Sequence, residues 1–298
     1  MDEKNILIRC DGLVKIYQCD DVEVMALQGL DLQIEQGELL AIIGKSGSGK
    51  STLMNMIGGL ERPTAGKLYL DGEDLYAKSD KEMTIYRREQ VGFVWQMSSK
   101  NLIPYLPAVE NVEAPMRGMG VGKEAMRERA LSLLERVGLS HKKDAYPHQM
   151  SGGEQQRVAI AVALANEPKI LLADEPTGAL DTKTSNQIQD LFRSLNEELG
   201  ITIIIVTHDM KLAHKVDRVL MISDGKISTE KVLKEDYRKA LQQLEDDSML
   251  NLFTHEEYSV LDKAGRLQLN DEMLEAAGID GNRVKVEIMD GKVVISKE

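Results

Sequence analysis

The most informative segment of this 298-residue chain is Leu39-Leu40-Ala41-Ile42-Ile43-Gly44-Lys45-Ser46-Gly47-Ser48-Gly49-Lys50-Ser51. Its first five residues are all apolar, and another apolar stretch runs from Thr52 to Leu60. This order predicts a buried strand, a glycine-rich loop and a helix. The glycines let backbone N–H groups curl around phosphate oxygens, and the positive end of the helix faces them. The segment therefore predicts a phosphate-binding loop between a strand and a helix.

The polar residues of this loop suit a nucleoside triphosphate and its metal ion. Lys50 would bridge the β- and γ-phosphates, and the Ser51 hydroxyl would ligate Mg²⁺. The glycine backbone would surround the phosphate oxygens. The predicted nucleotide-binding residues in this part of the chain are Gly44, Lys45, Ser46, Gly47, Ser48, Gly49, Lys50, Ser51 and Thr52.

Two further apolar segments, Lys169–Ala173 and Ile201–Val206, suit strands of a buried parallel sheet. Between them, Thr182–Leu199 has the apolar spacing of a helix and stops at Gly200. Strands that alternate with helices in this way form an α/β core. The fold class predicted from the sequence is therefore α/β.

Three segments lie outside this alternation. Ala108–Leu139 is rich in helix-forming residues, which predicts a helical subdomain inserted into the core over about residues 97–166. Residues 229–253 are charged and predict a linker helix. Residues 254–298 predict short strands and a hairpin at Asp290-Gly291, because Asp-Gly between alternating strands is a strong hairpin signal. About 40 residues are too few to bury a core unaided, so this β-rich unit should dimerise or dock.

The apolar segment Lys169–Ala173 ends in two carboxylates, Asp174 and Glu175. Asp174 is placed to hold Mg²⁺, directly or through water. Glu175 is within reach of a water molecule that attacks the γ-phosphate. Phosphoryl transfer needs chiefly positioning and charge neutralisation, so one base and one metal ion suffice. The strand end therefore predicts the base and the metal ligand of a nucleotide hydrolase.

A third motif, Ser151-Gly152-Gly153-Glu154-Gln155, opens a predicted helix 23 residues before Asp174. Taken alone, Ser-Gly-Gly is usually only a turn. In this order, however, the three motifs resemble those of the ATP-binding-cassette (ABC) ATPases, and the resemblance covers residues 1–228. In that family the Ser-Gly-Gly turn binds the γ-phosphate held by a second copy of the protein. The resemblance therefore implies ATP hydrolysis by a homodimer.

The resemblance also assigns roles to isolated residues. Gln96 matches a glutamine that touches Mg²⁺ and moves with the membrane partner, and His208 matches a histidine that orients the catalytic base. Tyr17 matches an aromatic residue that stacks on adenine, and Asp181 lies in the loop that couples the two sites. The implied catalytic residues are Lys50, Gln96, Glu175 and His208, the further nucleotide contacts are Tyr17, Ser151, Gly152, Gly153, Glu154 and Asp181, and the metal ligands are Ser51, Gln96 and Asp174.

Within the family, the segments Gly92–Gln96 and Glu110–Val112 look like those of the macrolide-export and lipoprotein-release (MacB/LolD-like) branch. ATPases of this branch dimerise beneath a separate transmembrane permease, which implies a location on the inner face of the cell membrane. The segment Met97-Ser98-Ser99-Lys100 holds about two more residues than the family pattern, where the permease should dock.

The bulk composition limits the alternatives. A formal net charge of −12 argues against a nucleic-acid partner. Two cysteines, Cys10 and Cys19, are too few for a disulfide framework, which indicates the reducing cytosol. The N-terminus lacks the pattern of a signal peptide, and the longest apolar stretches fall short of the roughly 18 residues that span a bilayer. These observations predict a cytoplasmic protein.

Residues 254–298 resemble the AbrB-like swapped-hairpin fold of transition-state regulators and antitoxins, which interleaves two chains. Many of those relatives bind DNA, but this segment carries ten acidic and six basic residues, the wrong sign for phosphate neutralisation. Dimerisation is therefore favoured over docking or DNA contact. Two other functions stay open: an ABC ATPase acting on translation or DNA, and a regulator whose C-terminal unit reads DNA. An ABC ATPase that acts on translation is expected to carry a second cassette, and one that acts on DNA a long coiled coil. The chain has neither.

Overall fold

The computed structural model describes residues 5–19, 22–97, 101–233, 255–261, 265–269, 271–280, 284–289 and 291–297. Their strands form a four-stranded sheet (β2-β1-β4-β5), a seven-stranded sheet (β11-β10-β9-β3-β8-β7-β6) and a two-stranded sheet (β12-β13). The strands are β1 (Ile6–Cys19), β2 (Val22–Glu35), β3 (Leu39–Ile43), β4 (Ala65–Leu70), β5 (Glu73–Asp74), β6 (Val91–Val94), β7 (Ile170–Asp174), β8 (Thr202–Thr207), β9 (Arg218–Ser223), β10 (Lys226–Leu233), β11 (His255–Ser259), β12 (Val284–Met289) and β13 (Lys292–Lys297).

The centre of the seven-stranded sheet is parallel and buried on both faces. Strand β3 pairs in parallel with β8 and β9, and β7 pairs in parallel with β6 and β8. Every residue of β3 and β8 is buried. Successive side chains of β3 enter two different cores: Leu40 and Ile42 enter one, while Ala41 and Ile43 enter the other. The predicted α/β core with a buried parallel sheet is confirmed.

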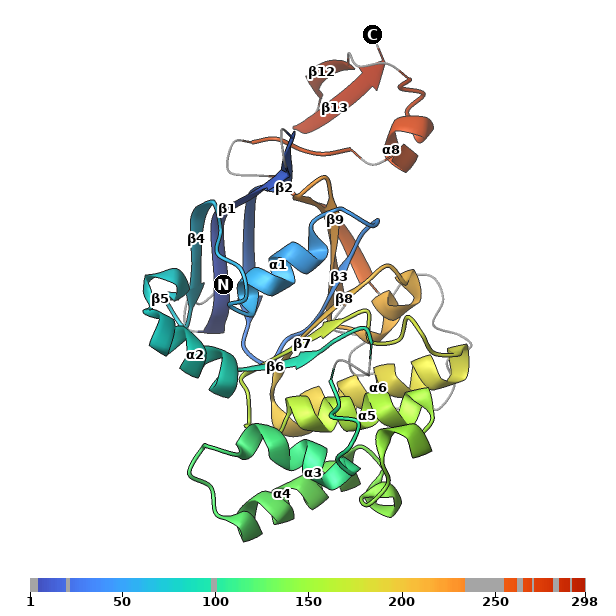
Figure 1. Ribbon diagram of the computed structural model, residues 1–298. Helices are drawn as coiled ribbons and strands as arrows, with labels where there is room; N and C mark the ends of the chain where they lie inside the picture. Colours follow the sequence, from blue (N-terminus) through green and yellow to red (C-terminus); the bar gives the residue numbers. More distant parts are fainter. Residues whose placement is uncertain are drawn as a thin grey trace.

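Helices cover both faces of this sheet (Figure 1). Helices α1 and α2 share a core with the four-stranded sheet, whereas α3 to α6 pack on the opposite face. The predicted bounds of α6 are confirmed, and Gly200 ends it with a φ of 62°. The described helices are α1 (Lys50–Ile57), η2 (Leu75–Ala77), α2 (Asp80–Glu89), α3 (Ala108–Glu113), η4 (Ala114–Met116), α4 (Lys123–Arg136), η5 (Ser140–Lys142), η6 (Pro147–Gln149), α5 (Gly152–Ala163), α6 (Thr182–Leu199), η7 (Met210–Lys215) and α8 (Asp271–Ala276).

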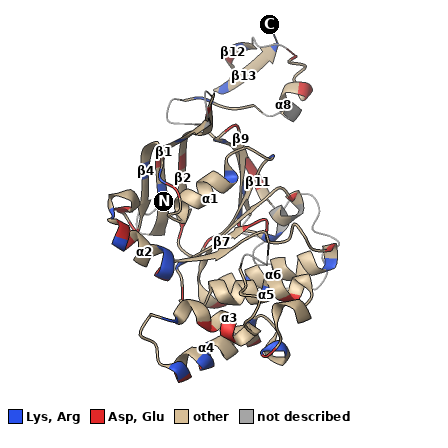
Figure 2. Cartoon of the chain, viewed as in Figure 1, with Lys and Arg blue, Asp and Glu red and all other residues tan. Residues whose placement is uncertain are grey.

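The helices between β6 and β7 occupy the range predicted for the helical subdomain. A buried side chain, Asn111, organises the entrance to this region. Its Oδ1 accepts from the Ile103 N–H (2.6 Å), and its Nδ2 donates to the Leu106 carbonyl (2.8 Å). Residues 98–100, which belong to the predicted insertion after Gln96, lie outside the described residues. Both acidic and basic residues occur in α2 and in α4, and Figure 2 colours the ribbon by these residue types.

The predicted linker helix is wrong for its first residues, because residues 229–233 belong to strand β10. Thr229 lies opposite Met221 of β9 and opposite Ser259 of β11, so both edges of the segment are hydrogen-bonded. The charges that suggested an exposed helix pair across strands instead, and Lys231 lies 3.0 Å from Glu257. The rest of the predicted helix, residues 234–253, lies outside the described residues. Strand β11, which the sequence grouped with the C-terminal unit, extends the seven-stranded sheet.

The C-terminal hairpin places four of its apolar residues on one face. Strands β12 and β13 pair antiparallel with Met289 opposite Lys292, as the predicted hairpin requires. Val286 lies opposite Ile295 and Ile288 opposite Val293, so these four side chains share a face. Ile288 is 80% exposed. Among the described residues, none of the helices has both the length and the apolar character needed to cross a membrane.

Candidate active site

The phosphate loop joins β3 to α1 at the carboxyl edge of the parallel sheet. Gly49, the residue before α1, has a φ of 102°, and a Cβ there would overlap the carbonyl oxygen of Ala26. No side chain caps this helix, so its first N–H groups are left for a ligand. The loop opens on a cavity of about 790 Å³, lined by Tyr17, Val24, Ala26, Lys45, Ser46, Gly47, Gly49, Lys50, Ser51, Thr52, Gln96, Asp174, Glu175 and His208.

The Lys50 side chain is held beneath the loop and is only 7% exposed. Its Nζ donates to the carbonyls of Gly44 (2.8 Å) and Lys45 (2.9 Å). Burial lowers the pKa of the ammonium, and the neighbouring Glu175 and Asp174 carboxylates oppose that shift. A phosphate group in the cavity would favour the charged ammonium in the same way. The fold therefore fixes the Lys50 ammonium at a position where it can bind an anion.

Two carboxylates from the end of β7 enter the same cavity. Glu175 has a φ of 45°, a left-handed conformation that costs a non-glycine residue of the order of 1 kcal/mol. Its N–H donates to the Val206 carbonyl (2.8 Å), which ties it to β8. Its Oε1 lies 2.8 Å from Nδ1 of His208, and its Oε2 accepts from the Thr207 hydroxyl at 3.1 Å. The hydrogen bonds fix the direction in which the carboxylate points.

The second carboxylate, Asp174, lies beside the phosphate loop. The Ser51 hydroxyl donates to its Oδ1 at 3.5 Å. Gln96, which follows β6, lines the same cavity. The three predicted metal ligands, Ser51, Gln96 and Asp174, are therefore brought together, although they come from three separate segments of the chain.

The Tyr17 ring on β1 lines the same cavity together with two apolar residues of β2. Val24 is the direct cross-strand partner of Tyr17, and Ala26 follows two residues later. Sequence reasoning missed both, because a pairing between two distant strands leaves no local pattern. It also missed Thr207, whose place directly before His208 at a strand end was the available signal.

The Ser-Gly-Gly turn lies elsewhere in the chain and does not line the cavity. Ser151 caps α5, accepting from the Glu154 N–H at 3.3 Å, and the Glu154 carboxylate accepts from the Ser151 N–H at 2.8 Å. Asp181 caps α6 through Thr184. The predicted nucleotide contacts absent from the cavity lining are Gly44, Ser48, Ser151, Gly152, Gly153, Glu154 and Asp181.

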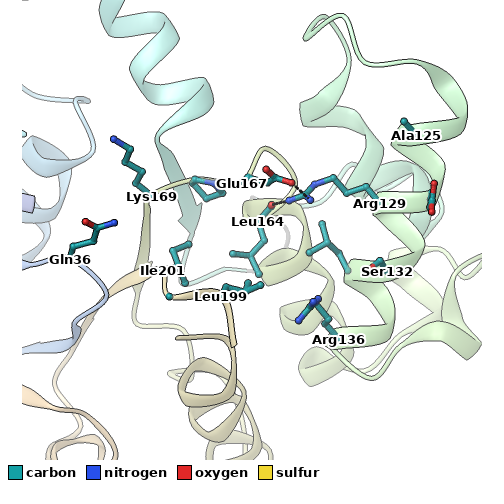
Figure 3. A pocket seen from close by; sticks show the side chains of 14 residues that line it. Gln36, Ala125, Arg129, Ser132, Arg136, Leu164, Glu167, Lys169, Leu199 and Ile201 are labelled. Atoms are coloured by element: carbon teal, nitrogen blue, oxygen red, sulfur yellow. Dashed lines mark hydrogen bonds and ion pairs between the residues drawn. The ribbon is translucent and has the colours of Figure 1, made fainter. Parts of the chain in front are cut away.

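A separate cavity of about 630 Å³ lies at the opposite edge of the sheet, between α4 and the loops that precede β7 and β8 (Figure 3). Leu164 and Ile201 line it together with Arg129 and Arg136. Arg129 donates to the Leu164 carbonyl at 3.1 Å, and Arg136 donates to Glu198 at 2.6 Å. These guanidinium groups hold α4 against the core. The cavity shares no lining residue with the one at the phosphate loop.

The parallel sheet, the uncapped helix at its carboxyl edge and the carboxylate–histidine pair define a nucleotide-hydrolysing cassette. Comparison with known proteins specifies the family. The family model described as ABC transporter matches residues 27–178, which include the phosphate loop, the Ser-Gly-Gly turn and both carboxylates.

Individual relatives extend the match beyond these residues. An uncharacterised ABC transporter ATP-binding protein of Bacillus subtilis, YknY, is 49% identical over 221 residues, which are 74% of this chain and 95% of that protein. A lipoprotein-releasing system ATP-binding protein, LolD 1, of Chlorobium chlorochromatii is 48% identical over 70% of this chain and 85% of that protein. A macrolide export ATP-binding/permease protein, MacB, of Rhodopirellula baltica is 44% identical over 82% of this chain but only 35% of that protein.

A solved structure agrees with these relatives. It is the dimeric post-hydrolysis state of the ATP-binding cassette MJ0796 bound to ADP and Pi, from Methanocaldococcus jannaschii. It matches with a TM-score of 0.69 and 43% identity, over 76% of this chain and 99% of that one. The chain belongs to the ABC transporter family. It is an ATP-binding ATPase of the MacB/LolD-like branch.

Proposed function

We propose that two copies of this chain enclose two ATP molecules and drive a separate membrane permease of export or mechanotransmission type. The supporting observation is the cavity in which the phosphate loop, Glu175 and His208 meet. Relatives named for macrolide export and lipoprotein release support the type of transport. In this proposal the protein is held at the inner face of the cell membrane by the permease.

Glu175 is the catalytic base of this proposal. It removes a proton from the water molecule that attacks the γ-phosphorus, and its Oε1 is held 2.8 Å from His208. His208 orients Glu175 and contacts the γ-phosphate. Lys50 neutralises the charge on the β- and γ-phosphates, and the N–H groups at the start of α1 surround the phosphate oxygens.

The donor set beside the phosphate loop fits Mg²⁺. The Ser51 hydroxyl, the Asp174 carboxylate and the Gln96 amide are hard oxygen donors, and Ser51 and Asp174 already lie 3.5 Å apart. Proteins usually hold Mg²⁺ through one or two carboxylates together with the phosphates of a substrate. When bound, the ion would neutralise phosphate charge and polarise the oxygen that leaves. We infer that these three residues are its ligands.

A second copy completes the site. Ser151 and Gly152 are exposed and lie outside the cavity of their own chain. In the proposed dimer they contact the γ-phosphate bound by the opposite copy, with Gly153 and Glu154 in the same turn. Asp181, which caps α6 beside this turn, couples the two sites.

The Glu175→Gln variant tests the proposal. The amide keeps the shape of the side chain but cannot accept the proton, so we expect ATP binding near the wild-type level and turnover at least about a hundredfold lower. Phosphate release and calorimetry measure the two quantities. The matched control is Glu167→Gln, a carboxylate at the opposite edge of the sheet. Full turnover in the Glu175 variant would refute the assignment of the base.

The permease is tested separately, by pulling the tagged protein from detergent-solubilised native membranes. A stoichiometric membrane protein is expected to accompany it. Recovery alone, or with ribosomes or nucleic acid, would contradict the transporter assignment and favour the other two functions that the sequence leaves open.

We further propose that the part of the chain after β11, which the sequence grouped in a 254–298 unit, forms an AbrB-like swapped-hairpin unit that dimerises. The exposed apolar face of the hairpin supports this, since Val286 is 59%, Ile288 80% and Val293 68% exposed. Pairing two such faces would bury them and keep the two cassettes at high effective concentration without ATP. Strands β10 and β11 would then join the hairpin unit to the main sheet.

The solution mass of the full chain without nucleotide tests this second proposal. Wild type should be dimeric, and Ile288→Glu should be monomeric because it places a charge in the apolar face. Lys285→Gln, on the opposite face of β12, is the matched control and should stay dimeric. A monomeric wild-type chain would overturn the idea. A point substitution is preferable to truncation at residue 228, because truncation would remove most of strand β10 and all of β11 from the main sheet.

A further inference from the structure

The hydroxyl of Tyr17, at the far end of the ring that lines the nucleotide cavity, is anchored. It donates to the Glu61 carboxylate and lies 3.4 Å from Oγ1 of Thr52, in the first turn of α1. Burial, together with the hydrogen bond to Glu61, raises the pKa of the phenol, so the hydroxyl keeps the proton that it donates. A ring held at its outer end in this way has a fixed orientation in the cavity.

Glu61 is itself held from several sides. Asn55 donates its Nδ2 to Oε1 of Glu61 at 2.8 Å, and Nζ of Lys15 lies 3.5 Å from Oε2. The Glu61 carbonyl accepts from the Tyr76 hydroxyl, which fixes the backbone as well. Although burial opposes ionisation, the hydrogen bonds from Tyr17 and Asn55 hold the pKa of the Glu61 carboxyl below its usual value. Glu61 is therefore an ionised acceptor in a fixed place.

Lys15 covers one face of the tyrosine ring. Its Nζ lies 5.0 Å from the ring centroid of Tyr17 and donates to the Arg62 carbonyl at 3.0 Å. An ammonium over an aromatic face is a favourable contact, and it occupies the space that a stacking group would need. A flat ligand can therefore stack only on the other face of Tyr17.

We propose that Glu61 is a positioning residue for the base of the nucleotide, acting through Tyr17 while Lys15 selects the ring face. Neither Glu61 nor Lys15 lines the cavity, so both act on the ligand indirectly, through the Tyr17 ring. Glu61 follows the helix that begins at the phosphate loop, which sets the base site at a constant distance from the phosphate site. The inference rests on the proposed function and on the adenine-stacking role that the family resemblance assigns to Tyr17, which lines the cavity.

The test compares Glu61→Gln and Tyr17→Phe with wild type in steady-state ATP hydrolysis. Tyr17→Phe removes the hydroxyl–carboxylate hydrogen bond, whereas Glu61→Gln replaces the charged acceptor with a weaker, neutral one, and both keep the ring. KM for ATP should therefore rise about fivefold to tenfold in Tyr17→Phe and at least about twofold in Glu61→Gln, with kcat within about twofold. The double variant should be no worse than Tyr17→Phe alone, because the two residues act through one contact. Glu73→Gln, an exposed carboxylate paired with Lys78, is the matched control and should behave as wild type.

Inorganic tripolyphosphate, which has no base, separates positioning from a structural effect. Its inhibition constant should be the same in wild type and in both variants. Equal weakening of ATP and tripolyphosphate would overturn the inference, since it would mean that the phosphate loop had moved. If Glu61→Gln fails to fold, Tyr17→Phe makes the same comparison.

The remaining outcomes separate this inference from the proposal on which it rests. An unchanged KM in Glu61→Gln and Tyr17→Phe, beside a raised KM in Tyr17→Ala, would overturn the role of Glu61 and leave the base contact standing. An unchanged KM in Tyr17→Ala would remove the base contact and the inference together. A wild-type chain without ATP hydrolysis would instead refute the proposed function.

Discussion

Two helices of this protein begin at glycine-rich turns, but they are capped in opposite ways. Helix α1 follows Gly49, has no side-chain cap and opens on the nucleotide cavity. Helix α5 follows Ser151, and its first turn is closed by the reciprocal hydrogen bonds between Ser151 and Glu154. Lys142 adds an ion pair to Glu154 at 3.6 Å. No side chain caps the first N–H groups of α1, whereas at α5 the N–H groups of Ser151 and Glu154 have partners within the chain.

The difference in capping follows from which chain supplies the phosphate that each turn would bind. The N–H groups of a first helical turn need acceptors. At α1 the phosphates held by the same chain would supply them. At α5 the phosphate would be supplied only by a second copy. In the single chain, the side chains of Ser151 and Glu154 cap the exposed turn instead. Helix α2 carries the same kind of capping box, formed by Ser79 and Glu82, and neither residue lines the cavity. It therefore serves as a control for the contribution of a capping box to stability alone.

Among the substitutions that test this comparison, Gly49→Ala should have the largest effect, which is a loss of ATP affinity. The residue would be strained at a φ of 102°, and its Cβ would push against the Ala26 carbonyl, so the loop must move. We expect ATP affinity to fall at least about a hundredfold, because shifts of roughly 1 Å have effects of that size. Calorimetry measures the affinity. Gly72→Ala, at a φ of 81° with no atom within 4 Å of the added Cβ, should bind ATP normally. Normal binding by the Gly49 variant would contradict the role given to α1.

Replacing Gly153 with Ala should disturb the turn before α5 and leave the phosphate loop before α1 in place. The new Cβ would overlap Cγ2 of Thr184, which displaces the turn, so turnover should fall about tenfold while ATP affinity of the single chain stays unchanged. Adding Thr184→Ser removes that methyl group but keeps the hydroxyl that donates to Asp181 at 2.6 Å. The double variant should therefore recover most of the turnover, and no recovery would exclude the steric explanation.

Replacing each capping serine with Ala compares the contributions of the α5 and α2 capping boxes to stability and to turnover. Ser151→Ala and Ser79→Ala should each lower the free energy of unfolding by about 1 kcal/mol, because each removes an N-cap. Only Ser151→Ala should also lower ATP turnover, by about threefold to tenfold, since only that hydroxyl would reach a phosphate. Denaturant titration and ATPase assays give the two quantities. Equal turnover in the two variants would show that the α5 turn is merely structural.

The smallest effect should be a dependence of stability on pH. Hydrogen bonds with Ser151 lower the pKa of Glu154, and those with Ser79 lower the pKa of Glu82. A lowered folded pKa means that each carboxylate stabilises the fold above the ordinary glutamate pKa of 4.5 and loses this contribution as the pH falls through the folded value. Glu154→Gln should therefore be less stable than wild type at neutral pH, with the gap closing in acid. A gap that persists in acid would contradict this origin.

Much of the active site could be predicted from the sequence, because its residues stand in short motifs at strand ends. Leu39–Ile43 and Lys169–Ala173 each specify a buried strand and the residues that follow it. Neighbouring parallel strands end at the same edge of a sheet, so motifs far apart in the chain meet there. Lys50, Asp174 and His208 each follow such a strand, and all three line one cavity.

Other features were decided only in the tertiary structure. Tyr17 meets Glu61 across 44 residues and Val24 across a strand pair, contacts that leave no trace in local periodicity. The charges of residues 229–233, taken alone, favour a helix, but these residues form a strand because β9 and β11 supply hydrogen-bond partners on both edges. The sequence by itself determined the elements with a strong apolar period and the residues at their ends. Pairing between distant segments depends on free energies that no local pattern contains, so only the folded chain could determine it.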